Sequence, residues 1–189
     1  MGDEYDGGRS KARIGINVTC YMSEEIKNRV SNSELLNFNL EDYYPEGERA
    51  FIDISQYLDQ GIVLREKEFR KALKEENWEI YRDKFVAIDC STDAIVPTWA
   101  FMLIVSHLDS LVKKAILGDL ETLEKILFLD ALSNIDLSKY KGKPVIVNGC
   151  GNKPVPDSAY LELTQVLKPV VKSLMFGEAC STVPIYKRK

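Results

Sequence analysis

Hydrophobic and polar residues follow two patterns along most of the chain. Short runs of β-branched and aromatic residues at 85–88, 115–117, 145–147 and 173–176 are typical of buried strands, and 183–186 is typical of an edge strand. Longer stretches between these runs repeat their apolar residues with helical spacing, which predicts helices. Because strands alternate with helices, the pattern favours an α/β fold with a mostly parallel sheet and helices on both of its faces.

The predicted helices differ in how they distribute their apolar residues. They span 67–76, 99–108, 120–131 and 158–167. The second is apolar nearly all round, so we expect it to be buried against a sheet. The third has Asp119 placed to cap its first turn. Its single expected apolar face carries Leu120, Leu123, Leu127 and Ala131.

The N-terminal part of the chain is less regular. Residues 1–21 lack periodicity and are rich in Gly, Asp, Arg and Lys. We interpret them as a disordered leader or upstream extension, and residues 22–189 as a single α/β domain. Residues 35–64 predict a small mixed β region at the N-terminal side of that domain, with strands at 51–54 and 61–64.

Composition and charge narrow the class of protein. The chain has 189 residues, of which 45% are hydrophobic, and a net charge of -4. A net negative charge does not favour binding to nucleic acid. The sequence contains neither an apolar run long enough to span a membrane nor a signal peptide, so we expect a cytoplasmic protein. In that reducing compartment the four cysteines are expected to be free thiols or metal ligands.

Three of the cysteines come shortly after predicted strands. They are Cys90, Cys150 and Cys180, which follow the runs that end at residues 88, 147 and 176. The carboxyl ends of parallel strands share one edge of a sheet, and ligands bind there. We therefore expect the three thiols, which are distant in sequence, to converge in space.

Converging thiolates are ligands for zinc, iron or an iron–sulfur cluster. Asp89, Glu178 and Asp93 are expected near the same edge, and each is a candidate for a fourth ligand or for tuning the site. Gly149 and Gly151 flank the second cysteine, where they let the backbone turn sharply and approach a bound group. The pattern thus predicts a metal-binding role for the three cysteines.

Two other interpretations remain open. In the first, the protein is a metal-free thiol enzyme, a sulfurtransferase or thiol oxidoreductase, in which one thiolate attacks and another resolves. In the second, it is a protein-interaction module with structural cysteines, and its acidic, aromatic loop 41–48 contacts a partner. The single histidine, His107, lies near the end of an apolar helix and is expected to be a helix partner rather than a catalytic base.

Several segments occur in a distinctive order along the chain. They are LEDYYPEGE at 40–48, DCSTDAIVPTWA at 89–100, GDLET at 118–122, GCGNKPVP at 149–156 and GEACSTVP at 177–184. Together, from about Met22 to the end of the chain, they resemble a bacterial family, found mainly in Bacteroidetes, that is catalogued as a domain of unknown function. The family has no established activity, so it assigns no catalytic residue.

The genes of that family often lie near iron–sulfur assembly genes. The resemblance therefore implies a role in iron–sulfur maturation or sulfur handling, with iron–sulfur assembly proteins as partners. We expect an accessory protein, a carrier or assembly factor, rather than an enzyme with turnover. Exposed edge strands also make a homodimer an expected form.

Overall fold

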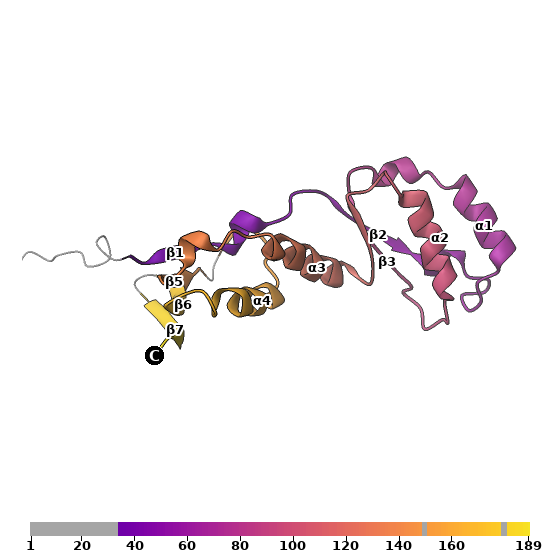
Figure 1. The fold of residues 1–189 in the computed structure, drawn as a ribbon. Coiled ribbons are helices and arrows are strands. Elements are labelled where there is room, and N and C mark those ends of the chain that lie inside the picture. Colours follow the sequence, from indigo (N-terminus) through magenta and orange to yellow (C-terminus); the bar gives the residue numbers. More distant parts are fainter. Residues whose placement is uncertain (1–33, 149–150, 179–180) are drawn as a thin grey trace, which may run out of the picture. The chain divides into compact units, whose positions relative to one another are not determined.

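The described residues form two sheets where the sequence predicted one main sheet. The computed structural model describes residues 34–148, 151–178 and 181–189, all within one unit of mutually contacting residues. The four-stranded sheet has the order β1-β5-β6-β7 and contains β1 (Leu36–Phe38), β5 (Pro144–Val147), β6 (Ser173–Glu178) and β7 (Ser181–Lys187). The three-stranded sheet has the order β2-β3-β4 and contains β2 (Arg49–Asp53), β3 (Phe85–Asp89) and β4 (Lys114–Leu117) (Figure 1).

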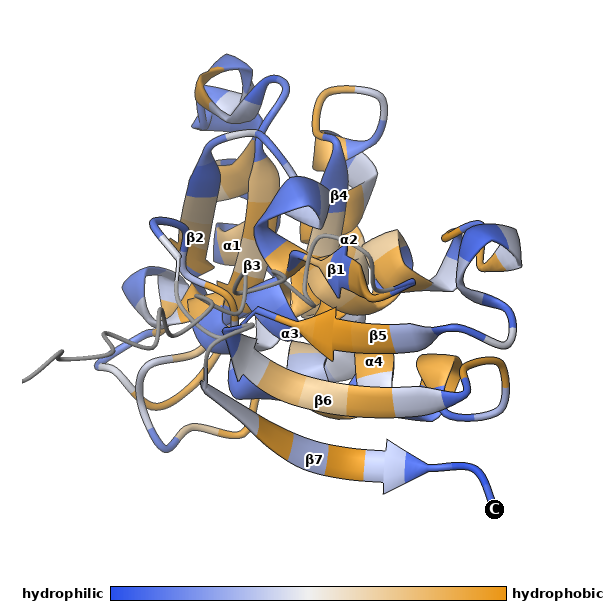
Figure 2. Cartoon of the chain, turned by 90° about the vertical axis from the view of Figure 1, so that its left-hand side faces the viewer, coloured by the Kyte–Doolittle hydropathy of each residue, from blue (hydrophilic) through white to orange (hydrophobic). Residues whose placement is uncertain are grey.

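Strand pairing confirms the predicted α/β class. All pairs in the three-stranded sheet are parallel. In the four-stranded sheet β1, β5 and β6 are parallel, and β7 pairs antiparallel with β6 at the edge. The edge position of β7 agrees with the strand predicted at 183–186. Figure 2 shows hydrophobic and polar residues alternating along β7, whereas β5 is mostly hydrophobic.

The mixed β region expected at 35–64 is not a separate element. β1 pairs in parallel with β5 in the four-stranded sheet. β2 pairs in parallel with β3 in the three-stranded sheet. The strand expected at 61–64 is wrong, because this stretch holds a turn and one antiparallel bridge between Asp59 and Val63. Gln60 and Gly61 have φ values of 52° and 73°, a turn geometry that interrupts an extended run. The leader 1–21 lies outside the described residues.

Helices connect most of the strands. The α-helices of the described residues are α1 (Glu66–Glu75), α2 (Thr98–Leu108), α3 (Leu120–Ser133) and α4 (Asp157–Leu167), and each overlaps a predicted helix. Short 3-10 turns are η1 (Leu40–Tyr43), η2 (Ile54–Tyr57), η3 (Trp78–Tyr81) and η4 (Ser138–Tyr140). As predicted, the Asp119 carboxylate caps α3 by accepting the Thr122 N–H. Across the described ranges, no helix has the length and apolar character needed to cross a membrane.

The three-stranded sheet has helices on both of its faces. Val86 and Ile88 of β3 pack with α1 and α2 on one face, where Phe69 and Leu73 of α1 are buried. Ala87, whose side chain points to the opposite face, packs with α3. The prediction of helices on both faces is therefore correct for this sheet.

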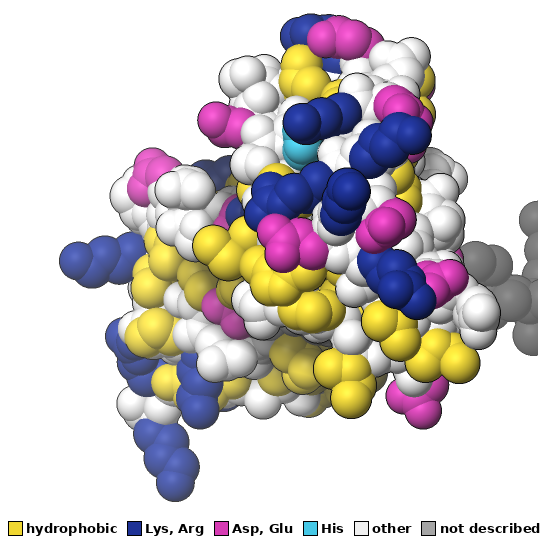
Figure 3. All heavy atoms as spheres, turned by 90° about the vertical axis from the view of Figure 1, so that its right-hand side faces the viewer, with side chains coloured by type: hydrophobic (Ala, Val, Ile, Leu, Met, Phe, Trp, Pro, Cys, Tyr) yellow, Lys and Arg dark blue, Asp and Glu magenta, His cyan; other side chains and the backbone are white. Residues whose placement is uncertain are grey.

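Helix α2 is buried on one side only. Ala100, Ile104 and Leu108 face the core of the three-stranded sheet. Met102 is 68% exposed and Val105 is 43% exposed, so the expected burial all round is wrong. The helix shares one face of a small sheet with α1, and this leaves its outer side uncovered. Figure 3 shows one face of the molecule, on which hydrophobic side chains lie at the surface among acidic and basic ones.

Helix α3 packs against both sheets. Leu123 and Leu127 belong to the cluster on the three-stranded sheet, whereas Phe128 and Leu132 are buried in the cluster of the four-stranded sheet. That second cluster also takes in the buried side of α4. The single apolar face predicted for α3 was incomplete, because the helix has a partner on each side and Leu120 is 44% exposed.

Candidate functional site

The cysteines predicted to converge do not all follow strands of one sheet. Cys90 comes directly after β3 of the three-stranded sheet, whereas Cys150 and Cys180 come after β5 and β6 of the four-stranded sheet. Cys150 and Cys180 themselves lie outside the described residues. Because β5 and β6 are adjacent and parallel, with Val147 opposite Phe176, the strands that precede these two cysteines do end at a common edge.

Cys90 is a half-buried free thiol. Its Sγ lies 3.4 Å from Oγ1 of Thr92, and its backbone N–H donates to Oδ1 of Asp89 over 2.8 Å. Asp93 is exposed in the same loop, whereas Glu178 is the last residue of β6 in the other sheet. In the ranges that the structure describes, no three or more His, Cys, Asp and Glu side chains are grouped to hold a metal ion.

The carboxylate of Asp53 organises the loop that contains Cys90. Its Oδ1 accepts the backbone N–H groups of Ser55 over 2.9 Å and of Ser91 over 3.0 Å. Its Oδ2 accepts the Ser91 hydroxyl over 2.6 Å. Burial raises the pKa of Asp53, but the hydrogen bonds from Ser91 and Ser55 outweigh it and hold the pKa well below its ordinary value. The carboxylate thus ties the end of β2 to the loop after β3.

Replacing Asp53 by asparagine should destabilise the protein at neutral pH by about 1–2 kcal/mol. The amide oxygen can still accept the two N–H groups, but the amide nitrogen that replaces Oδ2 cannot accept the Ser91 hydroxyl. The folded-state pKa lies below the unfolded one, so the stability due to Asp53 is present above about pH 4 and is lost as pH falls. Urea unfolding at pH 7 and pH 3 measures this.

The matched control for that variant is Asp93→Asn, which removes a charge from an exposed position in the same loop. It should leave the stability at pH 7 unchanged. An Asp53→Asn variant that loses the same stability at pH 3 as at pH 7 would contradict the linkage.

A cavity of about 370 Å³ opens at the carboxyl edge of the four-stranded sheet. Asn39 follows β1, and Asn148 follows β5, so the two amide side chains come from adjacent strand ends. The remaining lining comes from η1, the connection between β5 and α4, and α4 itself: Glu41, Gly151, Lys153, Pro154, Val155 and Tyr160. Apart from Gly151, the sequence interpretation missed these lining residues, although Asn148 directly after the predicted strand 145–147 was an available signal.

Gly151 approaches a side chain very closely. A Cβ at this position would lie 1.6 Å from Oε1 of Glu41, and the same oxygen accepts the backbone N–H of Lys153 over 2.7 Å. Glycine at this position therefore makes room for the Glu41 carboxylate, whereas the expected approach to a bound group stays a prediction. Gly149, the other glycine of the predicted turn, lies outside the described residues.

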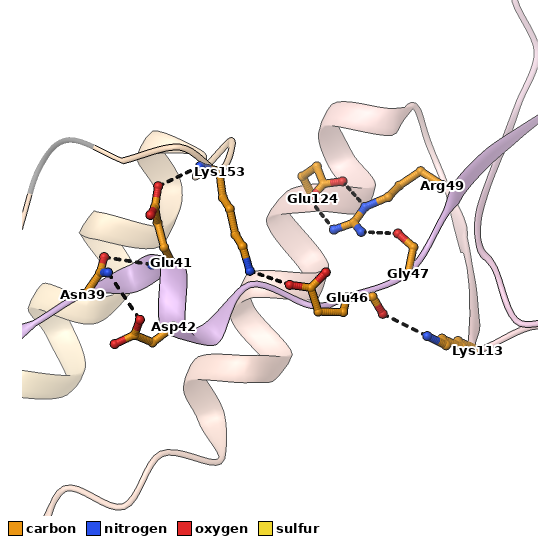
Figure 4. A network of polar contacts seen from close by, with 9 residues as sticks. All are labelled: Asn39, Glu41, Asp42, Glu46, Gly47, Arg49, Lys113, Glu124 and Lys153. Atoms are coloured by element: carbon orange, nitrogen blue, oxygen red, sulfur yellow. Dashed lines mark hydrogen bonds and ion pairs between the residues drawn. The ribbon is translucent and has the colours of Figure 1, made fainter.

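The acidic segment 41–48 is held by internal contacts, as Figure 4 shows. Lys153 pairs with Glu46, and its Nζ lies 5.1 Å from the centre of the Tyr44 ring. Hydrogen bonding from Lys153 lowers the pKa of Glu46. Glu46 and Glu48 have partners within the chain but remain largely exposed, so the interpretation of the loop as a partner-binding surface stays a prediction.

His107 stacks on an aromatic ring. Its imidazole lies parallel to the Trp78 ring, with 5.2 Å between the ring centroids and 12° between the planes. The Trp78 indole N–H in turn donates to the carbonyl of Leu73 over 2.8 Å. The imidazole thus packs on Trp78, which in turn packs against the hydrophobic cluster beside the three-stranded sheet.

Comparison with known proteins gives one match. A family model, described as a protein of unknown function, matches residues 24–188. No curated protein and no solved structure matches the chain. The match confirms the resemblance to an uncharacterised family, and it covers both sheets.

Proposed function

Since the chain belongs to the DUF2480 family of proteins of unknown function, we propose from its own residues that it is an accessory protein of iron–sulfur biogenesis. It binds zinc, iron or an iron–sulfur cluster through cysteine thiolates at the carboxyl edge of a sheet. The observation that carries the proposal is the pairing of β5 with β6, because Cys150 and Cys180 follow these two adjacent parallel strands.

The ligand chemistry suits this edge. Thiolates are soft ligands that favour zinc, ferrous iron and iron–sulfur clusters. Glu178 ends β6 and is exposed, so its carboxylate is the candidate for a further ligand beside Cys150 and Cys180. Positions on the metal that the protein does not fill are open to sulfide or to a partner's thiol, as a carrier or assembly factor requires.

Cys90 is the third candidate ligand, and its position allows a separate test. It directly follows Asp89, the last residue of β3 in the three-stranded sheet, and shares the next loop with Asp93. A site built by Cys150 and Cys180 does not need it, whereas a site built by all of the predicted cysteines does. Variants at each cysteine therefore define the ligand set.

Replacing Cys150 by serine should remove the bound metal without unfolding the chain, because the hydroxyl is a poor substitute for a thiolate ligand. We would measure metal, acid-labile sulfide and the visible absorption spectrum on untagged protein purified without oxygen. Visible colour with sulfide indicates a cluster, and colourless zinc indicates a structural or Lewis-acid site. Cys90→Ser is the matched control and should retain the metal if Cys150 and Cys180 form the site.

Two results would count against this proposal. The first is the absence of metal from protein purified without oxygen. This result would favour the metal-free thiol enzyme, in which one cysteine should alkylate fast at neutral pH. Full metal content in Cys150→Ser protein would exclude the ligand set centred on this residue. Equal, slow labelling of all thiols would then leave the cysteines with a packing role.

A further inference from the structure

We propose that the cavity beside Glu41 binds a small primary amine that carries no carboxylate next to its ammonium group. The cavity lies at the carboxyl ends of the parallel strands β1 and β5, the usual place for a ligand in an α/β sheet. Its volume of about 370 Å³ is at the lower end of the range for small-molecule sites. The inference concerns described residues only and does not depend on a metal.

The cavity offers a negative charge to a ligand. The Glu41 carboxylate lines it, and one of its oxygens accepts the Lys153 backbone N–H. Among the described residues, no hydrogen bond or ion pair reaches the other oxygen of Glu41. A carboxylate with free acceptor capacity in a partly enclosed site attracts a cation that donates hydrogen bonds.

The one ammonium group among the lining residues is engaged elsewhere. Lys153 extends away from Glu41 and pairs with Glu46, as Figure 4 shows. The Lys153 ammonium therefore acts on the Glu41 carboxylate only from a distance, and it forms its ion pair with Glu46 instead. A ligand that brings its own positive charge supplies the missing partner.

Asn148 provides a second polar contact. Its Oδ1 is buried and has no hydrogen-bond partner among the described residues, and an unpaired buried acceptor is unfavourable. The side-chain amide nitrogen of Asn148, a residue that lines the cavity, is a donor and can bind the hydroxyl oxygen of a ligand. A ligand carboxylate next to the ammonium group would instead lie close to Glu41, where like charges repel.

Three probes of similar size separate these contributions. Ethanolamine has an ammonium and a hydroxyl, ethylene glycol replaces the ammonium by a hydroxyl, and glycine replaces the hydroxymethyl group by a carboxylate. Ligand-observed NMR on the full chain should give a Kd on the order of millimolar for ethanolamine. Ethylene glycol and glycine should bind at least about tenfold more weakly.

The matched variants are Glu41→Gln and Glu48→Gln. Both remove one negative charge from the same segment, but Glu48 pairs with Lys84 outside the cavity. Ethanolamine binding should weaken at least about tenfold in the first and stay unchanged in the second. Thermal unfolding checks that each variant is folded, and if Glu41→Gln is not, the comparison of the three probes on the unaltered protein still decides.

Three outcomes would overturn the proposal. One is the absence of binding at ethanolamine concentrations up to about 50 mM, well above the expected millimolar Kd. Another is equal binding of ethylene glycol or glycine. The last is equal ethanolamine binding by folded Glu41→Gln protein and by the unaltered protein. Each of these results concerns ethanolamine binding, whereas the iron–sulfur role is tested by metal and sulfide content, so the two proposals can fail separately.

Discussion

Phe128→Ala should destabilise the protein by about 3–5 kcal/mol, as expected for deletion of a fully buried aromatic side chain. Phe128 has no exposed surface and lies on α3 in the core of the four-stranded sheet. Its ring also meets the Tyr44 ring edge-on, with 6.0 Å between the centroids. Replacement by alanine removes these contacts and leaves a cavity in the core of the four-stranded sheet.

The same variant tests whether α3 couples the two sheets. Trp78 and Trp99 both pack beside the three-stranded sheet, so tryptophan fluorescence reports on that sheet, whereas circular dichroism reports on the whole chain. Because Leu123 and Leu127 of α3 pack on the three-stranded sheet, loss of Phe128 should shift both denaturation curves together.

The matched control is Leu129→Ala at the next position of the helix. Leu129 is 47% exposed, so its truncation should change stability by less than about 1 kcal/mol. A fluorescence transition unchanged by Phe128→Ala, with a shifted circular dichroism transition, would show that the sheets unfold separately and that α3 does not couple them.

Local patterns sufficed to locate most elements of this fold, because helical and strand periodicity depend on neighbours in sequence. The runs 85–88, 115–117, 145–147 and 173–176 all lie within strands. What the patterns could not supply was strand order, which depends on contacts between distant segments. β1 pairs with β5, and β2 pairs with β3, so two strands adjacent in sequence enter different sheets.

The burial of two helices was mispredicted for the same reason, because it depends on which sheets and strands lie beside them. The apolar residues of α2 predicted burial on all sides, yet the three-stranded sheet covers only one side of it. Helix α3 was expected to have one apolar face and packs with two. In each case the number of neighbours, rather than the hydrophobicity of the helix, determines which side chains are buried.

The candidate sites also depend on contacts between distant segments, which local sequence patterns do not show. Cys150 and Cys180 follow β5 and β6, which pair with each other, but both cysteines lie outside the described residues, so their grouping stays a prediction. The grouping of Cys90 with them assumed a sheet order that the structure does not have. The cavity was missed because its main contact joins Glu41 to Lys153, 112 residues apart.

Glu124→Ala should cost about 2 kcal/mol of stability, because it leaves the Arg49 guanidinium partly buried without its anionic partner. Arg49 Nε lies 2.6 Å from Glu124 Oε1, and a second guanidinium nitrogen lies 3.0 Å from Oε2. The side chains are only 14% and 21% exposed. The hydrogen bond to Glu124 raises the pKa of Arg49. The guanidinium also stays charged in the variant, because the ordinary pKa of arginine is far above neutral.

The surroundings of Arg49 explain why this pair should exceed a surface ion pair. The guanidinium carbon lies 4.6 Å from the centre of the Tyr44 ring and 5.3 Å from that of Phe85. The guanidinium also donates to the carbonyl of Gly47 over 2.5 Å. The side chain thus links α3 with the three-stranded sheet and the acidic segment (Figure 4).

A double variant separates the cost of an unpaired charge from the worth of the pair. Arg49→Met with Glu124→Leu removes both charges and fills the space with apolar groups, so it should be more stable than Glu124→Ala alone. Glu121→Ala, which breaks an exposed pair with Lys125 on the same helix, should leave the urea midpoint unchanged. If the double variant proves as unstable as Glu124→Ala, the charge left without a partner is not the source of the loss, and packing around Tyr44 and Phe85 must be.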